Sequence, residues 1–241
     1  MADIFKPRGS EQEENHWLSV SDLMAGLMVV FLFIAIALMR NALIERDRIK
    51  EVAVAYQETQ VGIYNALIEE FADDLTRWNA EVDQETLTFT FNSPDVLFRQ
   101  GRIELSLAYR DLLSDFFPRY LEVLEQFRGG INEVRIEGHT SSGWNETTSP
   151  SEAYFLNMEL SQGRTRSVLE YVYGLDAIDE HQDWIKANIA AVGFSSAKIV
   201  NSAGLPAADN IQEDSNRSRR VTFRVISNAD IRIKQILELA E

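Results

Sequence analysis

A single carboxylate, Asp22, lies near the start of the only membrane-length apolar segment of the chain, Trp17 to Met39. From Leu23 to Met39 the segment carries no other charge. As a helix it would be roughly 34 Å long, enough to cross a hydrocarbon core of about 30 Å. An ionisable group at membrane depth costs several kcal/mol unless it has a partner, so such groups are functional by default. The pattern predicts one transmembrane helix at 17–39 with a functional carboxylate.

A secretory signal peptide is the alternative interpretation of this segment. Lys6 and Arg8 precede it, and Ala35-Ile36-Ala37 near its end fits a cleavage site. However, the apolar run exceeds the usual signal core of roughly 7 to 15 residues, and a carboxylate inside such a core would be unusual. We therefore favour an uncleaved membrane anchor.

Composition limits the functions that remain. A net charge of −15 argues against nucleic acid as a direct partner, because phosphate binding needs a basic face. The absence of cysteine excludes a disulfide framework and a thiolate metal site. His16, His139 and His181 lie far apart, so no histidine-based metal site is expected. No spacing brings a serine, a histidine and an acid together, and we expect that the chain is not an enzyme.

Before residue 85 the chain divides into three predicted parts. Residues 1–16 form a polar tail, 17–39 the transmembrane helix and 40–84 a juxtamembrane helical linker. The linker contains apolar residues at spacings of three and four, which is typical of an amphipathic helix. These residues are Ile63, Leu67, Phe71, Leu75 and Trp78. The apolar stripe could pack on its own domain or pair with another copy of the chain.

From Thr86 onward the hydrophobic period changes. Strands are predicted at 87–91, 134–137, 188–193 and 220–226, and helices at 107–127 and 158–173. Because strands and helices alternate, we expect an α+β fold, an α/β sandwich with helices on one face of a sheet, over 85–228. A further helix is expected at 229–241.

Four ordered blocks in this region carry a family resemblance. They are Leu97-Phe98 with Gly101 and Leu105, then Ile136-Glu137-Gly138-His139-Thr140, then Asn157-x-x-Leu160-Ser161-x-x-Arg164, then Ser218-Arg219-Arg220-Val221. The series resembles the OmpA-like peptidoglycan-binding domain over about 85–228. The resemblance implies a β/α sandwich whose loops bind the diaminopimelate-containing stem peptide of peptidoglycan.

The same resemblance assigns roles to individual residues. Arg164 matches the family's carboxylate-binding arginine, and Asn157 and Leu160 match positions that shape the pocket. Arg220 is also a candidate, although a residue at a strand start equally fits a structural ion pair. The candidate peptidoglycan-binding residues are Thr140, Ser141, Asn157, Leu160, Arg164 and Arg220.

One of these positions departs from the family pattern. The family usually has an aspartate, which binds the ligand amine, where this chain has Ser141. A neutral serine should weaken that contact by about 1 kcal/mol, the difference between charged and neutral hydrogen bonds. The predicted loop 141–156 is also longer than in the family. Glu146 or Glu152 could supply the missing carboxylate, or the loop could be only a surface insertion.

The membrane segment carries a second resemblance. The run from Trp17 through Ser21-Asp22-Leu23-Met24 to Met28 resembles the B subunit of ion-driven rotary stators, as in flagellar MotB, with Asp22 at the ion-carrying aspartate. Ser-Asp-Leu-Met-Ala-Gly is more similar to the branch that serves the Zorya anti-phage defence system than to the flagellar branch. A flagellar stator subunit and a passive OmpA-like envelope tether are the two alternatives.

The stator resemblance implies a partner assembly and a coupling ion. Two copies of the chain would pair inside five MotA-like membrane subunits, with peptidoglycan as the anchor and no direct contact with nucleic acid. Asp22 would carry a proton and no other cofactor would be needed, although one helix does not distinguish proton from sodium coupling. A simple helix N-cap is the other interpretation of Asp22. Asp22, Gly26, Val29 and Phe33 lie close to one helical face, where small residues let a partner helix approach.

The distribution of basic residues and the family resemblance predict opposite membrane topologies. Lys6 and Arg8 precede the span and four basic residues follow it between 40 and 50, so charge alone would place the C-terminal domain in the cytoplasm. The resemblance implies an inner-membrane protein with a cytoplasmic N-terminus and a periplasmic C-terminal domain. We adopt the second arrangement.

Overall fold

The computed structural model describes residues 10–92, 97–207 and 212–228, without the side chains of 10–19, 55 and 56. The chain divides into two compact units, Met1–Glu51 and Val52–Glu241, and each is described by itself. Helix α1, Ser10–Arg77, contributes residues to both. The described part of the predicted tail is therefore helical, from Ser10 onward. The helix expected at 229–241 lies outside the described residues.

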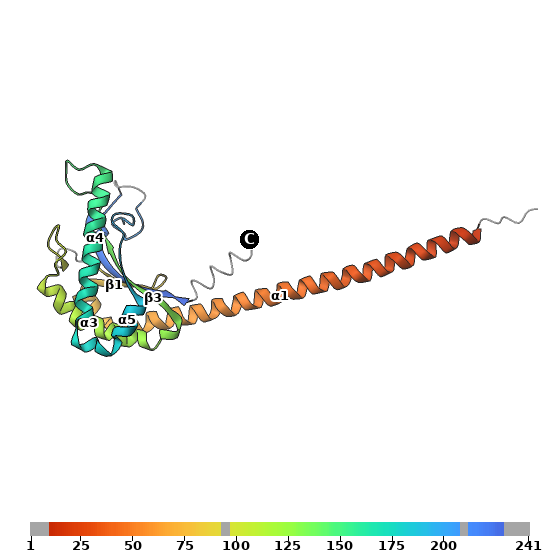
Figure 1. Cartoon of the computed structure of the whole chain (residues 1–241), viewed down its shortest axis with the longest axis horizontal. Helices are drawn as coiled ribbons and strands as arrows, with labels where there is room; N and C mark the ends of the chain where they lie inside the picture. The colour runs from red at the N-terminus through yellow and green to blue at the C-terminus, as the bar shows by residue number, and fades with distance from the viewer. Residues whose placement is uncertain (1–9, 93–96, 208–211, 229–241) are drawn as a thin grey trace, which may run out of the picture. The chain divides into compact units, whose positions relative to one another are not determined.

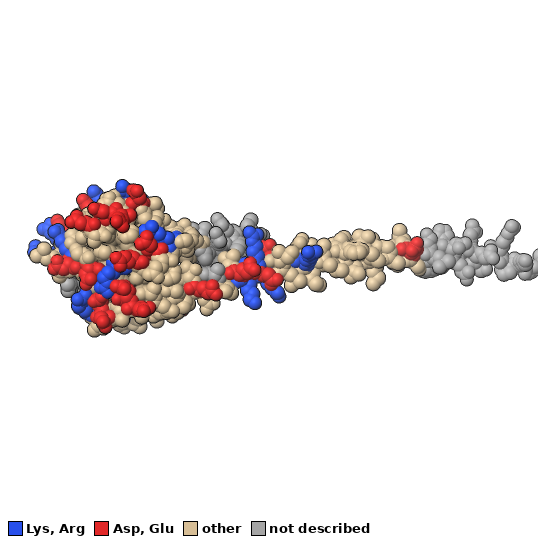
Figure 2. Space-filling model, turned by 90° about the horizontal axis from the view of Figure 1, so that it is seen from below, with Lys and Arg blue, Asp and Glu red and all other residues tan. Residues whose placement is uncertain are grey.

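The first unit contains the apolar turns of α1. Large side chains such as Leu23, Met28 and Phe33 are exposed all around this part of the helix. Figure 2 shows a stretch of several turns without a charged side chain. Among the described residues, one helix, within Val20–Arg77, is long and apolar enough to cross a membrane. A large exposed apolar surface is typical of a segment that lipid or partner helices cover.

The second unit is built on a five-stranded mixed sheet (Figure 1). Its strands are β1 (Ala80–Asp83), β2 (Thr88–Phe91), β3 (Ile131–His139), β4 (Ile189–Gly193) and β5 (Arg220–Ser227). Their order in the sheet is β1-β2-β5-β3-β4. Among these described strands, β3 and β4 pair in parallel and the other neighbours are antiparallel. All four predicted strands are present.

Helices pack on one face of this sheet. They are α3 (Leu107–Glu125), α4 (Pro150–Tyr173) and the short α5 (Gln182–Asn188). A four-residue helix, α6 (Ser215–Ser218), precedes β5, and 3₁₀ turns lie at Arg128–Gly130 and Asp176–His181. Helix α4 contacts β3 and β4. Helix α3 places Phe116 against Phe89 and Phe223, with ring centroids 4.7 and 5.1 Å away. The expected α+β class, with helices on one face of a sheet, is confirmed.

The last turns of α1 belong to the core of the second unit. Ile63, Leu67 and Phe71 are fully buried. The ring of Phe71 lies 5.4 Å from that of Phe89 and 5.2 Å from that of Phe116. Of the two interpretations of the stripe, packing on its own domain is the one observed.

A charged contact reinforces this packing. Arg119 of α3 donates to Glu70 at 2.6 Å and to Asp74 at 2.8 Å, both on α1, and its guanidinium lies 4.7 Å from the Phe71 ring centre. These bonds tie α1 to α3 on the outside of the apolar contact. The end of α1 is thus a structural element of the domain rather than a separate linker.

Several elements differ from the sequence prediction, which also lacked the short helices α5 and α6. Strand β1 was missed because it is a four-residue edge strand in which Glu81 and Asp83 alternate with small apolar residues. The predicted loop 141–156 is wrong in its second half, since α4 begins at Pro150 rather than at Met158. The side chain of Ser149 accepts the N–H of Glu152, and proline at the first helical position is favourable, so helix starts there.

Close contact between α4 and the sheet fixes the position of the helix. A Cβ on Gly138 of β3 would lie 2.8 Å from the backbone oxygen of Ser161. A Cβ on Gly193 of β4 would lie 2.5 Å from the backbone nitrogen of Gln162. Only glycine allows this approach, which brings the middle of α4 beside the end of β3.

Candidate functional site

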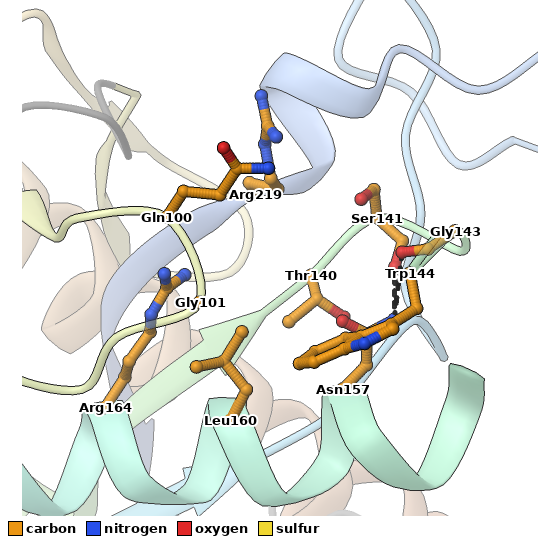
Figure 3. Close-up of a pocket in the computed structure, with 10 residues that line it drawn as sticks. All are labelled: Gln100, Gly101, Thr140, Ser141, Gly143, Trp144, Asn157, Leu160, Arg164 and Arg219. Carbon is orange, nitrogen blue, oxygen red and sulfur yellow. Dashed lines mark hydrogen bonds between the residues drawn. The ribbon is translucent and has the colours of Figure 1, made fainter. Parts of the chain in front are cut away.

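The end of β3 and one face of α4 enclose a cavity of about 300 Å³ (Figure 3). Thr140 and Ser141 follow β3 directly. Asn157, Leu160 and Arg164 lie three and four residues apart on α4 and therefore share a face of the helix. The residues that line the cavity are Gln100, Gly101, Thr140, Ser141, Gly143, Trp144, Asn157, Leu160, Arg164 and Arg219.

Arg164 connects α4 to the segment on the far side of the cavity. Its Nε donates to the carbonyl of Arg102 at 2.9 Å and its Nη2 to that of Arg99 at 3.4 Å. The guanidinium lies 4.8 Å from the ring centre of Phe98, and the residue is only 8% exposed. Figure 3 shows the guanidinium directed toward Gly101 at the cavity wall. The charge is thus held at one end of the cavity, where it can attract a carboxylate.

The opposite end is a loop fixed by hydrogen bonds. Asn157 donates from Nδ2 to the carbonyls of Ser141 and Gly143, at 3.1 and 3.2 Å (Figure 3). Glu213 accepts the backbone N–H of Ser142 at 3.0 Å and also its hydroxyl. Two distant segments therefore fix this loop, which presents Trp144 to the cavity.

The cavity brings together five of the six predicted peptidoglycan-binding residues. Thr140 is buried, and its Oγ1 has no hydrogen-bond partner within the described part of the chain. Arg220 is not among the lining residues. It alternates along β5 with buried Val221 and lines a separate groove, while its neighbour Arg219 lines the cavity instead.

Carboxylates are missing from the described lining of this cavity. Neither Glu146 nor Glu152 is among those residues, and both are exposed. Glu213 accepts the N–H of Ser142, beside the cavity residue Ser141. This contact could not be predicted from the sequence, because 71 residues separate Ser142 from Glu213. Trp144 and Gln100 were also missed, since nothing in their spacing marks them.

His139 precedes Thr140 but does not share its cavity. It lies in the groove that contains Arg220, with its ring stacked on that of Phe194 at 5.3 Å. Burial lowers the pKa of His139 to about 4. The imidazole is therefore neutral at pH 7 and adds no charge near Thr140.

Asp22 lies on α1 in the first unit. The carboxylate and its neighbours on the helix are exposed. One turn further on, nothing lies within 4 Å of the position that a Cβ on Gly26 would occupy. Gly26 adds no side chain to the face on which the sequence predicts a partner helix.

Comparison with known proteins decides the family. No protein-family model matches this chain. The Zorya protein ZorB of Escherichia coli is 55% identical over 229 residues, which cover 95% of this chain and 94% of that protein. The chain belongs to the ZorB family. This identity confirms the predicted resemblance to the Zorya branch of stator subunits.

Two solved structures are also similar to this ZorB family member. A MotB-like protein from Desulfovibrio vulgaris is 20% identical, with a TM-score of 0.47, over 73% of this chain and 94% of that one. The cell wall anchor of the type VI secretion system from Pseudomonas aeruginosa is 21% identical, with a TM-score of 0.44, over 67% and 97%.

Proposed function

We propose that this chain is the peptidoglycan-anchored B subunit of a proton-driven stator that acts in Zorya anti-phage defence. The observation that carries the proposal is the 55% identity to the Zorya protein ZorB over 95% of the chain. In this function the chain is not an enzyme. Its two units have separate tasks, ion transfer in the membrane and attachment to the cell wall.

Asp22 is the proton carrier in this proposal. It is the one carboxylate in the apolar turns of α1, and Gly26 leaves room for a partner helix beside it. A protonated, neutral Asp22 can pass an apolar wall that the anion cannot. One charge that crosses 100 mV releases about 2.3 kcal/mol, enough to bias a conformational step.

The partner that completes the proton path is a MotA-like membrane subunit. We propose five copies around two copies of this chain, which pair with each other. The N-terminus lies in the cytoplasm and the second unit in the periplasm, where peptidoglycan is available. This arrangement holds the B subunits still while proton flow turns the surrounding ring.

The cavity beside α4 is the proposed stem-peptide site. Arg164 supplies the cation for a ligand carboxylate, and Asn157 and Leu160 form the floor. Ser141 offers a neutral acceptor for the ligand amine, so we expect weaker binding than in relatives with an aspartate there. No carboxylate lines the described part of the cavity to compensate for it.

A phage plaque assay tests the proposed function. The chain is expressed with its genomic neighbours, and Asp22→Asn is compared with Asp47→Asn, an exposed carboxylate on the same helix that pairs with Arg46. We expect Asp22→Asn to abolish protection while the complex still assembles, and Asp47→Asn to retain it. Protection that survives Asp22→Asn but not Arg164→Ala would favour a passive envelope tether instead.

A further inference from the structure

Trp144 is an exposed aromatic residue in a loop of small and polar residues. Its neighbours between Ser141 and Ser149 are serine, glycine, asparagine, glutamate and threonine. The indole lines the cavity beside α4, yet Trp144 is 40% exposed. A tryptophan that remains exposed at the wall of a cavity is typical of a residue that a ligand covers, because its ring offers a large contact surface.

Hydrogen bonds fix the loop on both sides of this indole. Before it, Asn157 and Glu213 bond to residues 141–143. After it, Oδ1 of Asn145 accepts both the backbone N–H and the hydroxyl of Thr147, at 3.0 Å each. The backbone that carries the indole is therefore ordered before a ligand binds, which lowers the entropy lost on binding.

The charges of the cavity leave one group of the ligand without a charged partner. Arg164 and Arg219 are the cations among the described lining residues, and no carboxylate is among them. The proposed stem-peptide ligand carries an amine as well as carboxylates, and Ser141 offers that amine only a neutral acceptor. The face of an aromatic ring also attracts a cation within about 6 Å of its centre, and tryptophan does so most strongly. Trp144 is the aromatic residue of the described lining.

The direction of the indole suits an amine next to the carboxylate that Arg164 attracts. Figure 3 shows the indole directed from its loop toward Leu160, which lies between Asn157 and Arg164 on α4. Asn157 and Arg164 are about 10.5 Å apart along the helix axis. The free end of diaminopimelate carries its amine and its carboxylate on one carbon atom, so a carboxylate held at Arg164 brings the amine toward the ring.

We propose, on the basis of the proposed stem-peptide site, that the face of the Trp144 indole binds the ligand amine by a cation–π interaction. This contact takes the place of the aspartate that the OmpA-like resemblance implies at position 141. Arg164 binds the carboxylate on the same carbon atom. The site therefore recognises a stem peptide whose amine is free and protonated.

Isothermal titration of the full-length protein in detergent micelles tests this contact with two probes. The first is a stem tripeptide that ends in diaminopimelate and has its alanine amine acetylated, so that one amine is free. In the second probe that amine is acetylated too. We expect the wild type to bind the second probe about tenfold more weakly, as for a partly desolvated cation–π pair. Trp144→Leu should bind the two probes equally. Phe155→Leu, at a 67% exposed aromatic residue of α4, should discriminate like the wild type.

Fluorinated tryptophan at position 144 separates the charge of the ring face from its shape. Fluorine withdraws electron density from the face, so the affinity for the free-amine probe should fall with each added fluorine atom. The affinity for the acetylated probe should stay constant, which a purely structural role of the ring would not predict.

Two different negative results are distinguishable. If Trp144→Leu still discriminates between the probes and fluorination has no effect, the cation–π contact is wrong while the stem-peptide site stands. If the wild type binds neither probe with saturation, the stem-peptide site itself is wrong, and this contact with it.

Discussion

The carboxylate of Glu213 accepts the backbone N–H of Ser142 at 3.0 Å, across 71 residues of sequence. Ser141, the adjacent residue, occupies the position at which the OmpA-like resemblance implies a ligand-binding aspartate. Its carbonyl accepts a hydrogen bond from Asn157 at 3.1 Å. A carboxylate is thus present one residue away from the expected place, but it fixes the loop instead of lining the cavity.

Glu213→Gln should weaken the binding of peptidoglycan. The substitution keeps the shape of the side chain and removes the charge that strengthens both bonds to Ser142. A loss of about 1 kcal/mol corresponds to roughly fivefold weaker binding in a peptidoglycan pelleting assay. Glu146→Gln, at an exposed position of the same loop, is the control and should bind like the wild type. If Glu213→Gln pellets with peptidoglycan as well as the wild type does, the loop does not need this carboxylate to hold it in place.

Arg164→Ala should abolish the same binding. The guanidinium is the cation at the end of the cavity, and its loss also removes the hydrogen bonds that Arg164 donates to the carbonyls of Arg102 and Arg99. Hydrogen bonds to charged groups contribute about 1.5–3 kcal/mol, so at least a tenfold loss is expected. Arg166→Ala, at an exposed position of the same helix, should have no effect. If both variants pellet equally, Arg164 is not part of the site.

Gly138→Ala should destabilise the second unit. Its Cβ would lie 2.8 Å from the backbone oxygen of Ser161, and the helix would have to move. Overpacking of this kind costs about 1–3 kcal/mol, or a decrease in Tm of about 3 to 10 °C for a unit of this size. Gly129→Ala meets nothing within 4 Å and should unfold like the wild type by circular dichroism. An unchanged Tm for Gly138→Ala would mean that α4 does not approach β3 this closely.

His139 should make the fold sensitive to acid. Burial lowers its pKa to about 4, from an ordinary value of 6.5. Between these values the unfolded chain binds a proton that the folded chain does not, so stability falls as pH falls through this window, by about 3 kcal/mol in total. Burial alone would raise the pKa of Glu137, but the hydrogen bond with His139 and the charge of Lys198 leave it lowered, so its contribution is also lost on acidification.

Replacement of His139 tests this pH dependence. The free energy of unfolding, measured by denaturant titration between pH 7 and pH 4.5, should decrease less steeply for His139→Asn than for the wild type. His181→Asn should keep the slope of the wild type. An identical slope for all three proteins would show that His139 is not buried in its neutral form.

Local patterns predicted much of the fold. Alternation identified the strand at 87–91, and the stripe Ile63, Leu67 and Phe71 identified the end of α1. The stripe could not say which surface covers it, because an apolar face fits its own domain and another copy equally well. The start of α4 was predictable in principle, since Ser149 and Pro150 are helix-start signals.

Contacts between distant segments could not be predicted in this way. The resemblance placed Thr140, Asn157 and Arg164 together, but the pairing of Glu213 with Ser142 depends on how two loops meet in three dimensions. Arg220 shows the same limit. An arginine suits an anion site. However, side chains alternate along β5, so Arg220 lies on the face of the sheet opposite the cavity.

Proton flux through the assembled complex tests the central claim, that Asp22 carries the coupling ion. The chain and its MotA-like partner are reconstituted in liposomes with a pH-sensitive dye, and a membrane potential is imposed. The account predicts flux for the wild type and for Asp47→Asn, and none for Asp22→Asn, although all three complexes assemble. Flux of wild-type size through Asp22→Asn would contradict it.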